Sequence, residues 1–229
     1  MALPVCIIVG YGPGNGQGIA RAFGRAGFSL GLLARSPGKL AGPLAELEAA
    51  GYGAELIAAD AGDEQSLTAG LGTARDRLGD AEVLVYNAVA FRMAPPTAIT
   101  TDQLVADFRT NVAGALAAAN FVLPAMKARR SGAVLFTGGG WALYPSAAVA
   151  STAIGKAGLR HLALMLSEEL QGSGVRAGTV TIMGLVAAGT AFDPNRIGEA
   201  FVTAYRKPLD QFEPEMQFRG AENAEPGLS

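Results

Sequence analysis

Five glycines occupy alternate positions between Gly10 and Gly18, directly after an apolar run. That run, residues 5–9, reads Val-Cys-Ile-Ile-Val, which is typical of a buried strand, and Ile19 and Phe23 then begin a helical pattern. Glycine permits positive φ and a close approach of the backbone, and the first turn of a helix offers N–H groups with partial positive charge. The segment therefore predicts a strand, a turn and a helix that bind the phosphate of a nucleotide cofactor.

The composition excludes several classes of protein. The chain has 229 residues, of which 50% are hydrophobic and 17% charged, as expected for one α/β domain with a large core rather than a disordered or fibrous protein. The formal net charge is −2 and the largest basic cluster is Arg129-Arg130, so nucleic acid is not expected as a partner. The stretch 131–155 has no charged residue, but glycines and Pro145 interrupt it, so no membrane partner is expected either.

The single cysteine, Cys6, lies inside the first expected strand and is interpreted as a small buried hydrophobic residue. One cysteine allows no disulfide framework within the chain, and no metal site is expected. The apolar run near the start is too short for a secretory signal and lacks a preceding basic region. These features together predict a cytoplasmic protein.

Short apolar runs alternate with amphipathic helical patterns. Strands are expected at 4–9, 29–34, 54–59, 83–86, 133–137 and 176–182. Apolar faces of two helices are formed by Leu40, Leu44 and Leu47, and by Leu67, Leu71, Ala74 and Leu78. Asp63 and the pair Asp193-Pro194 predict helix starts. The alternation predicts a single Rossmann-type α/β domain over 1–229, with a doubly wound parallel sheet between two helix layers and a flexible tail from about 220 to 229.

The end of the second expected strand indicates which cofactor binds. In a dinucleotide-binding fold this position meets the adenosine ribose, where a carboxylate binds the 2′-hydroxyl and an arginine accommodates a 2′-phosphate. Here the strand ends in Arg35-Ser36, with no acid nearby. We expect NADP(H), with Arg35 as the phosphate partner and Ser36 as a second donor. The alternative is a solvated arginine at the end of a strand.

From Val5 to about Phe201 the chain resembles the short-chain dehydrogenase/reductase family. The glycine loop is similar to the family's TGxxxGxG motif, Asp60-Ala61 to the pair that holds the adenine, and Asn87-Ala88-Val89 to its NAG segment. Met183-Gly184 resembles the PG pair that opens the loop over nicotinamide and substrate. The expected cofactor-binding residues are therefore Gly10, Gly12, Pro13, Gly14, Asn15, Gly16, Arg35, Ser36, Asp60, Ala61, Asn87, Ala88, Val89, Lys156, Gly184, Val186 and Thr190.

The resemblance also implies a catalytic site around Lys156, which matches the lysine of the YxxxK motif, and Asn111, which matches an asparagine that orders a proton-relay water. Where the family has its tyrosine this chain has Thr152, and where it has its serine the chain has Gly139. An aliphatic hydroxyl titrates far above a phenol, so Thr152 can hydrogen-bond an oxygen but is a poor general acid. Tyr144 is a candidate for the missing acid, or else a wall of the cleft.

The sequence also gives predictions for Trp141, His161 and the loop 185–208. Trp141 is interpreted as a wall of the substrate cleft. His161, the only histidine, is interpreted as structural, because it lies about 140° round the helix from Lys156. The loop 185–208 is expected to form a lid, with Phe192 and Phe201 as its apolar lining.

Two functions from different classes follow. The first is an NADP(H)-dependent oxidoreductase acting on a small carbonyl, alcohol or activated alkene, with the proton supplied by water, Lys156, Tyr144 or the substrate. The second is a non-catalytic NADP(H)-binding protein that presents a surface to a partner. In either case the stretches 104–125 and 151–170 resemble helices that pair with their copies, so a homodimer or homotetramer is expected. Candidate interface residues, or alternatively core residues, are Ala153, Ala157 and Leu164.

Overall fold

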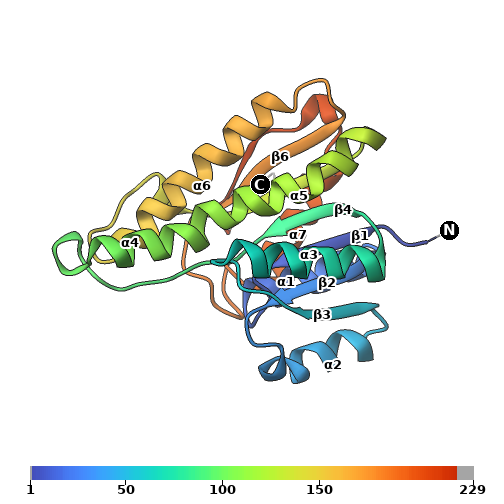
Figure 1. Cartoon of the computed structure of the whole chain (residues 1–229), viewed down its shortest axis with the longest axis horizontal. Coiled ribbons are helices and arrows are strands. Elements are labelled where there is room, and N and C mark those ends of the chain that lie inside the picture. Colours follow the sequence, from blue (N-terminus) through green and yellow to red (C-terminus); the bar gives the residue numbers. More distant parts are fainter. Residues whose placement is uncertain (1, 221–229) are drawn as a thin grey trace, which may run out of the picture.

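Seven parallel strands form one sheet in the order β3-β2-β1-β4-β5-β6-β7, in a computed structural model that describes residues 2–220 (Figure 1). The strands are β1 (Val5–Val9), β2 (Ser29–Ala34), β3 (Ala54–Ala58), β4 (Ala81–Tyr86), β5 (Gly132–Gly139), β6 (Val175–Ile182) and β7 (Glu215–Phe218). The strand order reverses between β1 and β4, so the expected doubly wound parallel sheet is confirmed. The expected tail beyond Gly220 lies outside the described residues.

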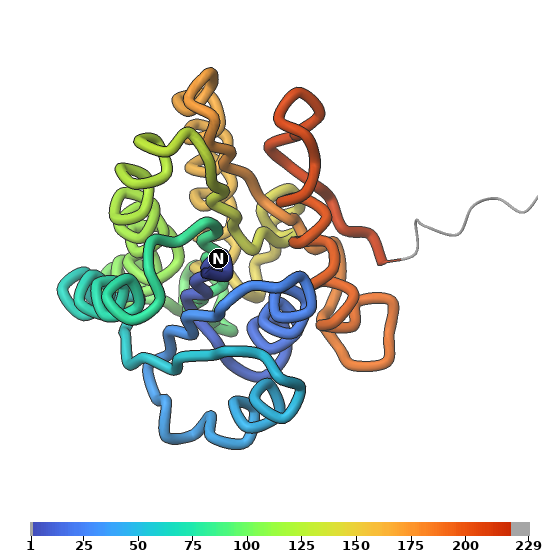
Figure 2. Tube along the Cα trace, turned by 90° about the vertical axis from the view of Figure 1, so that its right-hand side faces the viewer, coloured from blue at the N-terminus to red at the C-terminus, as the bar shows by residue number. Residues whose placement is uncertain are grey.

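Helices cover both faces of the sheet (Figure 2). One face carries α1 (Asn15–Arg25), α2 (Ala41–Ala49) and α7 (Pro194–Arg206). The other carries α3 (Glu64–Leu78), α5 (Gly114–Arg129) and α6 (Ala150–Glu169). A short α4 (Thr101–Phe108) continues through a π-helical turn, Arg109–Ala113, into α5. Single 3₁₀ turns lie at Pro37–Lys39, Pro96–Ala98, Gly140–Ala142 and Leu209–Gln211.

Both expected helix starts are confirmed by their caps. The Asp63 carboxylate accepts a hydrogen bond from the Ser66 amide at 2.8 Å at the start of α3. The Asp193 carboxylate accepts one from the Asn195 amide at 2.8 Å, and Pro194 opens α7. Behind the first cap, the expected apolar face of α3 packs into the core, and its buried members are Leu67, Leu71 and Ala74. Cys6 is buried in β1 without a disulfide, as expected.

Glycines allow α7 to pack tightly on α1. A Cβ added to Gly18 would lie 2.0 Å from the Pro194 carbonyl oxygen, and one on Gly198 would lie 2.3 Å from the Gly18 carbonyl oxygen. The expectation of a lid over 185–208 is therefore corrected. Residues 194–206 of this stretch form α7, which belongs to the helix layer beside α1. Phe201 is fully buried in that layer, so the expectation that it lines the substrate pocket is wrong.

The edge strand β7 was not expected from the sequence. It pairs in parallel with the end of β6, from Thr179 opposite Glu215 to Ile182 opposite Phe218. Its four residues alternate two apolar with two polar side chains, which is too short a pattern to stand out. A tertiary contact holds it, because the Arg160 guanidinium on α6 binds the Glu215 carboxylate at 2.6 Å.

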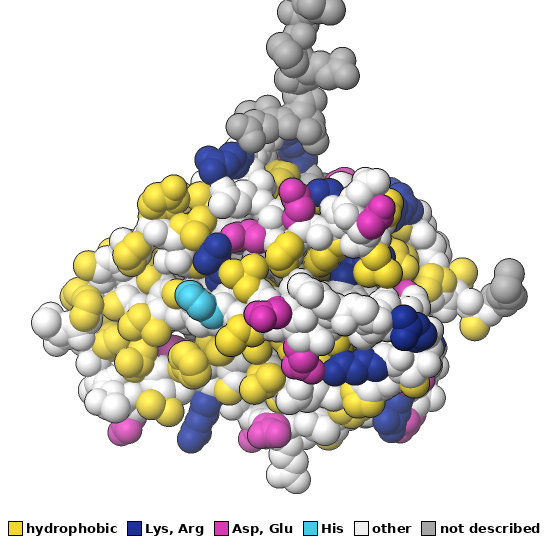
Figure 3. Space-filling model, turned by 90° about the horizontal axis from the view of Figure 1, so that it is seen from above, with side chains coloured by type: hydrophobic (Ala, Val, Ile, Leu, Met, Phe, Trp, Pro, Cys, Tyr) yellow, Lys and Arg dark blue, Asp and Glu magenta, His cyan; other side chains and the backbone are white. Residues whose placement is uncertain are grey.

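Apolar side chains remain exposed along α4, α5 and α6. Figure 3 shows hydrophobic side chains around His161, the single histidine. The large exposed apolar residues on these three helices are Val105, Phe108, Leu116, Ile154 and Met165. Within residues 2–220, no helix is both long and apolar enough to cross a membrane.

Candidate functional site

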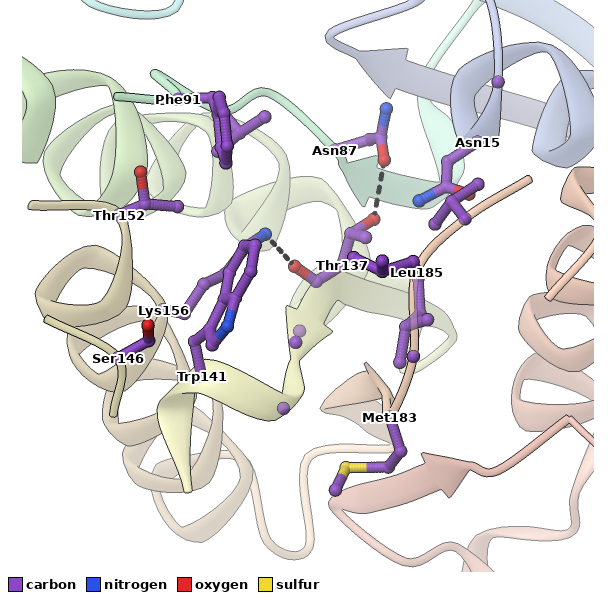
Figure 4. Close-up of a pocket in the computed structure, with 18 of the residues that line it drawn as sticks. Asn15, Asn87, Phe91, Thr137, Trp141, Ser146, Thr152, Lys156, Met183 and Leu185 are labelled. Atoms are coloured by element: carbon purple, nitrogen blue, oxygen red, sulfur yellow. Dashed lines mark hydrogen bonds between the residues drawn. The ribbon is translucent and has the colours of Figure 1, made fainter. Parts of the chain in front are cut away.

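A cavity of about 750 Å³ opens at the carboxyl ends of β1, β4, β5 and β6 (Figure 4). Its walls come from the glycine loop after β1, the loops after β4, β5 and β6, and the first two turns of α6. The loops after β1 and β4 run to opposite sides of the sheet, because the strand order reverses there, and this leaves a crevice between them. The topology thus places the cavity at the position where such sheets bind ligands.

The glycine loop lies against the loop that follows β4. Gly10 has φ +86°, and a Cβ there would lie 2.4 Å from the Ala88 amide nitrogen. The Asn87 side chain joins three strand ends, since its Nδ2 donates to the Gly10 carbonyl at 2.9 Å and its Oδ1 accepts from Thr137 Oγ1 at 3.0 Å. A Cβ on Gly12 or Gly14 would meet no protein atom within 4 Å. The loop therefore keeps open backbone where a ligand can approach.

Two buried polar atoms near this loop have no hydrogen-bond partner among the described residues: the Tyr11 hydroxyl and Asn15 Oδ1. Leaving such an atom unpaired costs about 1–3 kcal/mol. Asn15 lines the cavity at the start of α1, whose first turn carries no acid. Burial raises the pKa of Tyr11 to about 12, so its hydroxyl stays protonated. The open backbone at Gly12 and Gly14 and the start of α1, which carries no acid, fit a phosphate-bearing dinucleotide.

The residues expected around adenosine come together at the adjacent strand ends, outside the cavity itself. Arg35 and Ser36 are exposed after β2, and Arg35 forms no ion pair with any residue between 2 and 220. Asp60 follows β3, and its carboxylate accepts from the Gly62 amide at 2.9 Å, while Ala61 is buried. The sheet thus places these side chains at the same edge as the glycine loop.

Lys156 projects from α6 into the cavity, where its amine donates to the Thr137 carbonyl at 2.6 Å (Figure 4). Burial lowers the pKa of Lys156 to about 8. Beside it, a Cβ on Gly139 would lie 3.7 Å from Lys156 Cε, which is an ordinary contact, so packing does not require glycine there. At Gly138, by contrast, a Cβ would lie 2.4 Å from Thr179 Oγ1.

Thr152 and Asn111 both bind the segment that follows β4. Thr152 is buried and its Oγ1 accepts from the Arg92 amide at 3.1 Å, although it also borders the cavity. Asn111 lies in the π-helical turn outside the cavity wall. Its Oδ1 accepts from the Ala90 amide at 2.7 Å and its Nδ2 donates to the Ala90 carbonyl at 3.1 Å. Through these hydrogen bonds, the two residues anchor the loop after β4.

Aromatic residues form the outer part of the cavity. Trp141 lines it, as expected of a cleft wall, and Tyr144 lines it with 68% of its surface exposed. His161 lies outside it on the surface of α6, with its Nδ1 3.0 Å from the Ala157 carbonyl oxygen.

The loop after β6 contributes some of its expected residues to the cavity. Gly184 and Val186 line it, and a Cβ on Gly184 would lie 2.2 Å from the Phe192 ring. Thr190 does not line it, because its hydroxyl donates to the Ala187 carbonyl at 2.8 Å and accepts from the Phe192 amide at 3.1 Å. These contacts close a turn ahead of α7.

The cavity residues that the sequence analysis did not name include Phe91 and Ser146, and Leu185 was expected only as the start of a lid. Phe91 and Leu185 follow the carboxyl ends of β4 and β6, respectively, by a few residues. In a parallel sheet such positions meet at one edge, and this is the signal that could have found them. Among residues 2–220, no group of three or more His, Cys, Asp or Glu is placed to hold a metal ion.

Comparison with known proteins gives consistent results. Residues 4–193 match the short chain dehydrogenase family. Oxidoreductase UcpA of Escherichia coli K12 is 31% identical over 180 residues, which cover 76% of this chain and 66% of UcpA. A short chain dehydrogenase of Pseudocercospora fijiensis, MYCFIDRAFT_6125, is 29% identical over 171 residues, which cover 74% of this chain and 55% of that protein. The matched region thus spans between about half and two thirds of these relatives.

A solved structure resembles the fold across nearly its full length. The crystal structure of a metagenomic short-chain oxidoreductase in complex with NADP has a TM-score of 0.84 and 24% identity. The similarity covers 93% of this chain and 96% of that one. It establishes the architecture of the sheet and its helices.

We expect the Lys156 amine to titrate near pH 8 in the ligand-free protein, because burial lowers its pKa to about 8 from an ordinary value of 10.5. The folded chain then releases this proton before the unfolded chain does. The free energy of unfolding should therefore rise with pH between about 8 and 10.5 through this group, and Lys156→Met should remove that rise. Competitive acetylation with peptide mass spectrometry measures the midpoint, and a value near 10.5 would contradict the assignment.

Proposed function

Since this chain belongs to the short-chain dehydrogenase family, we propose that it is an NADP(H)-dependent oxidoreductase acting on a small carbonyl, alcohol or activated alkene. The observation that carries the proposal is the placement of the Lys156 amine in the same cavity as the open glycine loop. At one end of the cavity, the glycine loop offers backbone groups suited to phosphate. At the other end, the amine of Lys156 lies among apolar side chains.

The glycine loop and the start of α1 would hold the pyrophosphate, with backbone N–H groups as donors. Asp60 and Ala61 would hold the adenine, and Asn87, Ala88 and Val89 would lie beside the nicotinamide ribose with Lys156. The bound cofactor supplies or accepts the hydride. Asn15 Oδ1, unpaired among the described residues, would accept a hydrogen bond from a ribose hydroxyl or the nicotinamide amide of the cofactor rather than meet its phosphates.

Arg35 supports a preference for NADP(H) over NAD(H). Arg35 is exposed at the end of β2, and its guanidinium forms no ion pair with a carboxylate among residues 2–220. A guanidinium binds a phosphate through paired, charge-assisted hydrogen bonds. Ser36 would add a hydroxyl donor beside it.

Proton transfer is assigned to Lys156, directly or through a water molecule. A pKa of about 8 leaves the amine mostly protonated at neutral pH and close enough to neutrality to exchange the proton. Thr152 has its oxygen engaged by the Arg92 amide, so we assign it a positioning role. Asn111 positions the same segment through Ala90, and Tyr144 is assigned to the outer wall of the cavity, where 68% of its surface is exposed.

A second candidate function, a protein that binds NADP(H) without turnover, is favoured by one observation. The hydroxyl at position 152 is committed to the loop after β4, and Gly139 offers no side chain to polarise a substrate carbonyl. Such a protein would use the cofactor to order a surface for a partner.

We also propose a homodimer or homotetramer that buries the exposed apolar residues of α4, α5 and α6. Of the interface candidates, Ala153 is buried within its own subunit, whereas the adjacent Ile154 is 47% exposed. Met165, 59% exposed, lies on the same helix. An exposed apolar face of this kind is typical of an interface between copies.

Light scattering should give a mass of two or four times 23.3 kDa. Ile154→Glu should lower that mass, because a charge would be buried in the contact. Leu3→Glu, which alters an exposed leucine outside these helices, serves as the control. A wild-type mass of 23.3 kDa at micromolar concentration would refute the assembly.

Replacement of Arg35 tests the cofactor preference. Arg35→Asp should raise the dissociation constant of NADPH by about ten- to a hundredfold, because it exchanges charge-assisted hydrogen bonds for repulsion, while that of NADH changes little. Arg206→Asp makes the same charge change at the exposed end of α7 and should affect neither. Titration calorimetry gives all the constants. Equal weakening of both cofactors by Arg35→Asp would exclude the 2′-phosphate contact.

A turnover assay separates the two candidate functions. Loss of NADPH absorbance with a panel of carbonyls and activated alkenes should reveal a substrate for the wild type. Lys156→Met should lower kcat by about a hundredfold or more by removing the proton donor, whereas Lys127→Met, on the surface of α5, should not. NADPH binding with no turnover on any member of the panel would favour the non-catalytic function.

A further inference from the structure

We propose that the cavity binds a flat, uncharged, ring-bearing substrate against a wall formed by Phe91 and Trp141. This inference rests on the proposed function, because it names the substrate class for the same cavity. It is carried by the geometry of the two rings, by the contacts that fix Phe91 in place, and by the absence of carboxylates among the described residues of the cavity wall.

The two rings lie next to each other on the cavity wall. Their centroids lie 6.1 Å apart and their planes differ by 30°, so the rings are closer to parallel than to perpendicular. In Figure 4 both stand on one side of the cavity, with Met183 and Leu185 on the other. The end of β5, Gly138 and Gly139, and the Gly140 that follows it line the cavity without adding side chains. The space between the aromatic surface and the aliphatic side chains therefore suits a flat ring.

Phe91 is 57% exposed, yet the residues on both sides of it are held firmly. Ala90 is bound through its amide and its carbonyl by the Asn111 side chain. On the other side, the Arg92 amide donates to Thr152 Oγ1 at 3.1 Å. These bonds fix the backbone that carries the ring.

The side chain of Arg92 strengthens the attachment. Its guanidinium binds the Asp107 carboxylate through two hydrogen bonds of 2.7 and 3.0 Å. Asp107 is buried on α4 and also accepts from Ser151 Oγ at 2.7 Å. A satisfied buried network of this kind specifies one position for the loop. An exposed aromatic ring in a fixed position costs little entropy when it binds a ligand, which favours a role in recognition.

The charge of the cavity wall restricts the substrate further. Among the described residues that line the cavity, Lys156 is the only charged one, and its amine already donates to the Thr137 carbonyl. No carboxylate faces the cavity to pair with a cation, and Lys156 would repel one. Elsewhere in the wall, Val89 and Leu185 add apolar side chains, and Tyr144 and Ser146 add uncharged hydroxyl groups. An uncharged ring system is the ligand that this surface complements.

The test compares two ketones that share a carbonyl and a six-membered ring. Acetophenone is flat and aromatic, and cyclohexyl methyl ketone is puckered. NADP⁺ is first shown to bind by calorimetry and is then kept saturating, so that neither ketone can be reduced. Trp141 is the only tryptophan, so its single indole N–H signal in a nitrogen-labelled protein reports ligand binding at the wall itself.

We expect acetophenone to bind about tenfold more tightly than cyclohexyl methyl ketone in the wild type. Phe91→Leu keeps an apolar side chain but removes the ring, so it should remove most of this difference. Met93→Leu is the matched control, because Met93 is exposed in the same loop and does not line the cavity. It should leave the difference unchanged.

Equal affinity for both ketones, with no effect of Phe91→Leu, would overturn the aromatic wall while leaving the oxidoreductase proposal intact, provided that NADP⁺ binds. Tighter binding of benzoate than of acetophenone would overturn the uncharged substrate class. Failure of NADP⁺ to bind would instead refute the proposed function, and the same ketone titrations without cofactor would still decide whether the wall recognises a ring.

Discussion

The close approach of the β1 and β4 ends is the constraint on which the site depends. Gly10 fits against the Ala88 amide only because it has no Cβ, and Asn87 then bonds across to Gly10 and Thr137. This contact aligns the carboxyl ends of three strands. It thereby positions the start of α1, the loop after β4, and the Thr137 carbonyl on β5 that accepts from Lys156. A larger residue at position 10 would separate the two halves of the cavity.

A polar network holds the loop after β4 in place. Thr152 stands next to the cavity, but its oxygen is bonded to the Arg92 amide, and Asn111 is committed to Ala90 in the same way. Arg92 itself is held by Asp107. On the described cavity wall, Lys156 is the one side chain of the Lys, Arg, His, Asp or Glu type. Buried hydroxyls and amides in this part of the molecule order an aromatic side chain.

Features that depend on local chemistry could be predicted from the sequence. The strands β1 to β6 follow from short apolar runs, and the caps at Asp63 and Asp193 follow from residue types that bind free helix N–H groups. The edge strand β7 could not be predicted in this way, because its attachment depends on Arg160, 55 positions earlier. The prediction that Phe201 lines the pocket failed for a similar reason. An apolar side chain suits either a pocket or a core, and Phe201 lies in the core because α7 packs on α1.

The sequence by itself determined the doubly wound sheet, the glycine loop and the residues at the strand ends, because periodicity and backbone freedom act over a few neighbouring positions. Only the tertiary structure decided which of those residues share a cavity. Lys156 and Phe91 both line the cavity. Thr190 instead closes a turn, and the Asn111 side chain hydrogen-bonds the Ala90 backbone. Such choices depend on hydrogen-bond partners and packing contacts that lie far apart in the chain, and no local pattern encodes them.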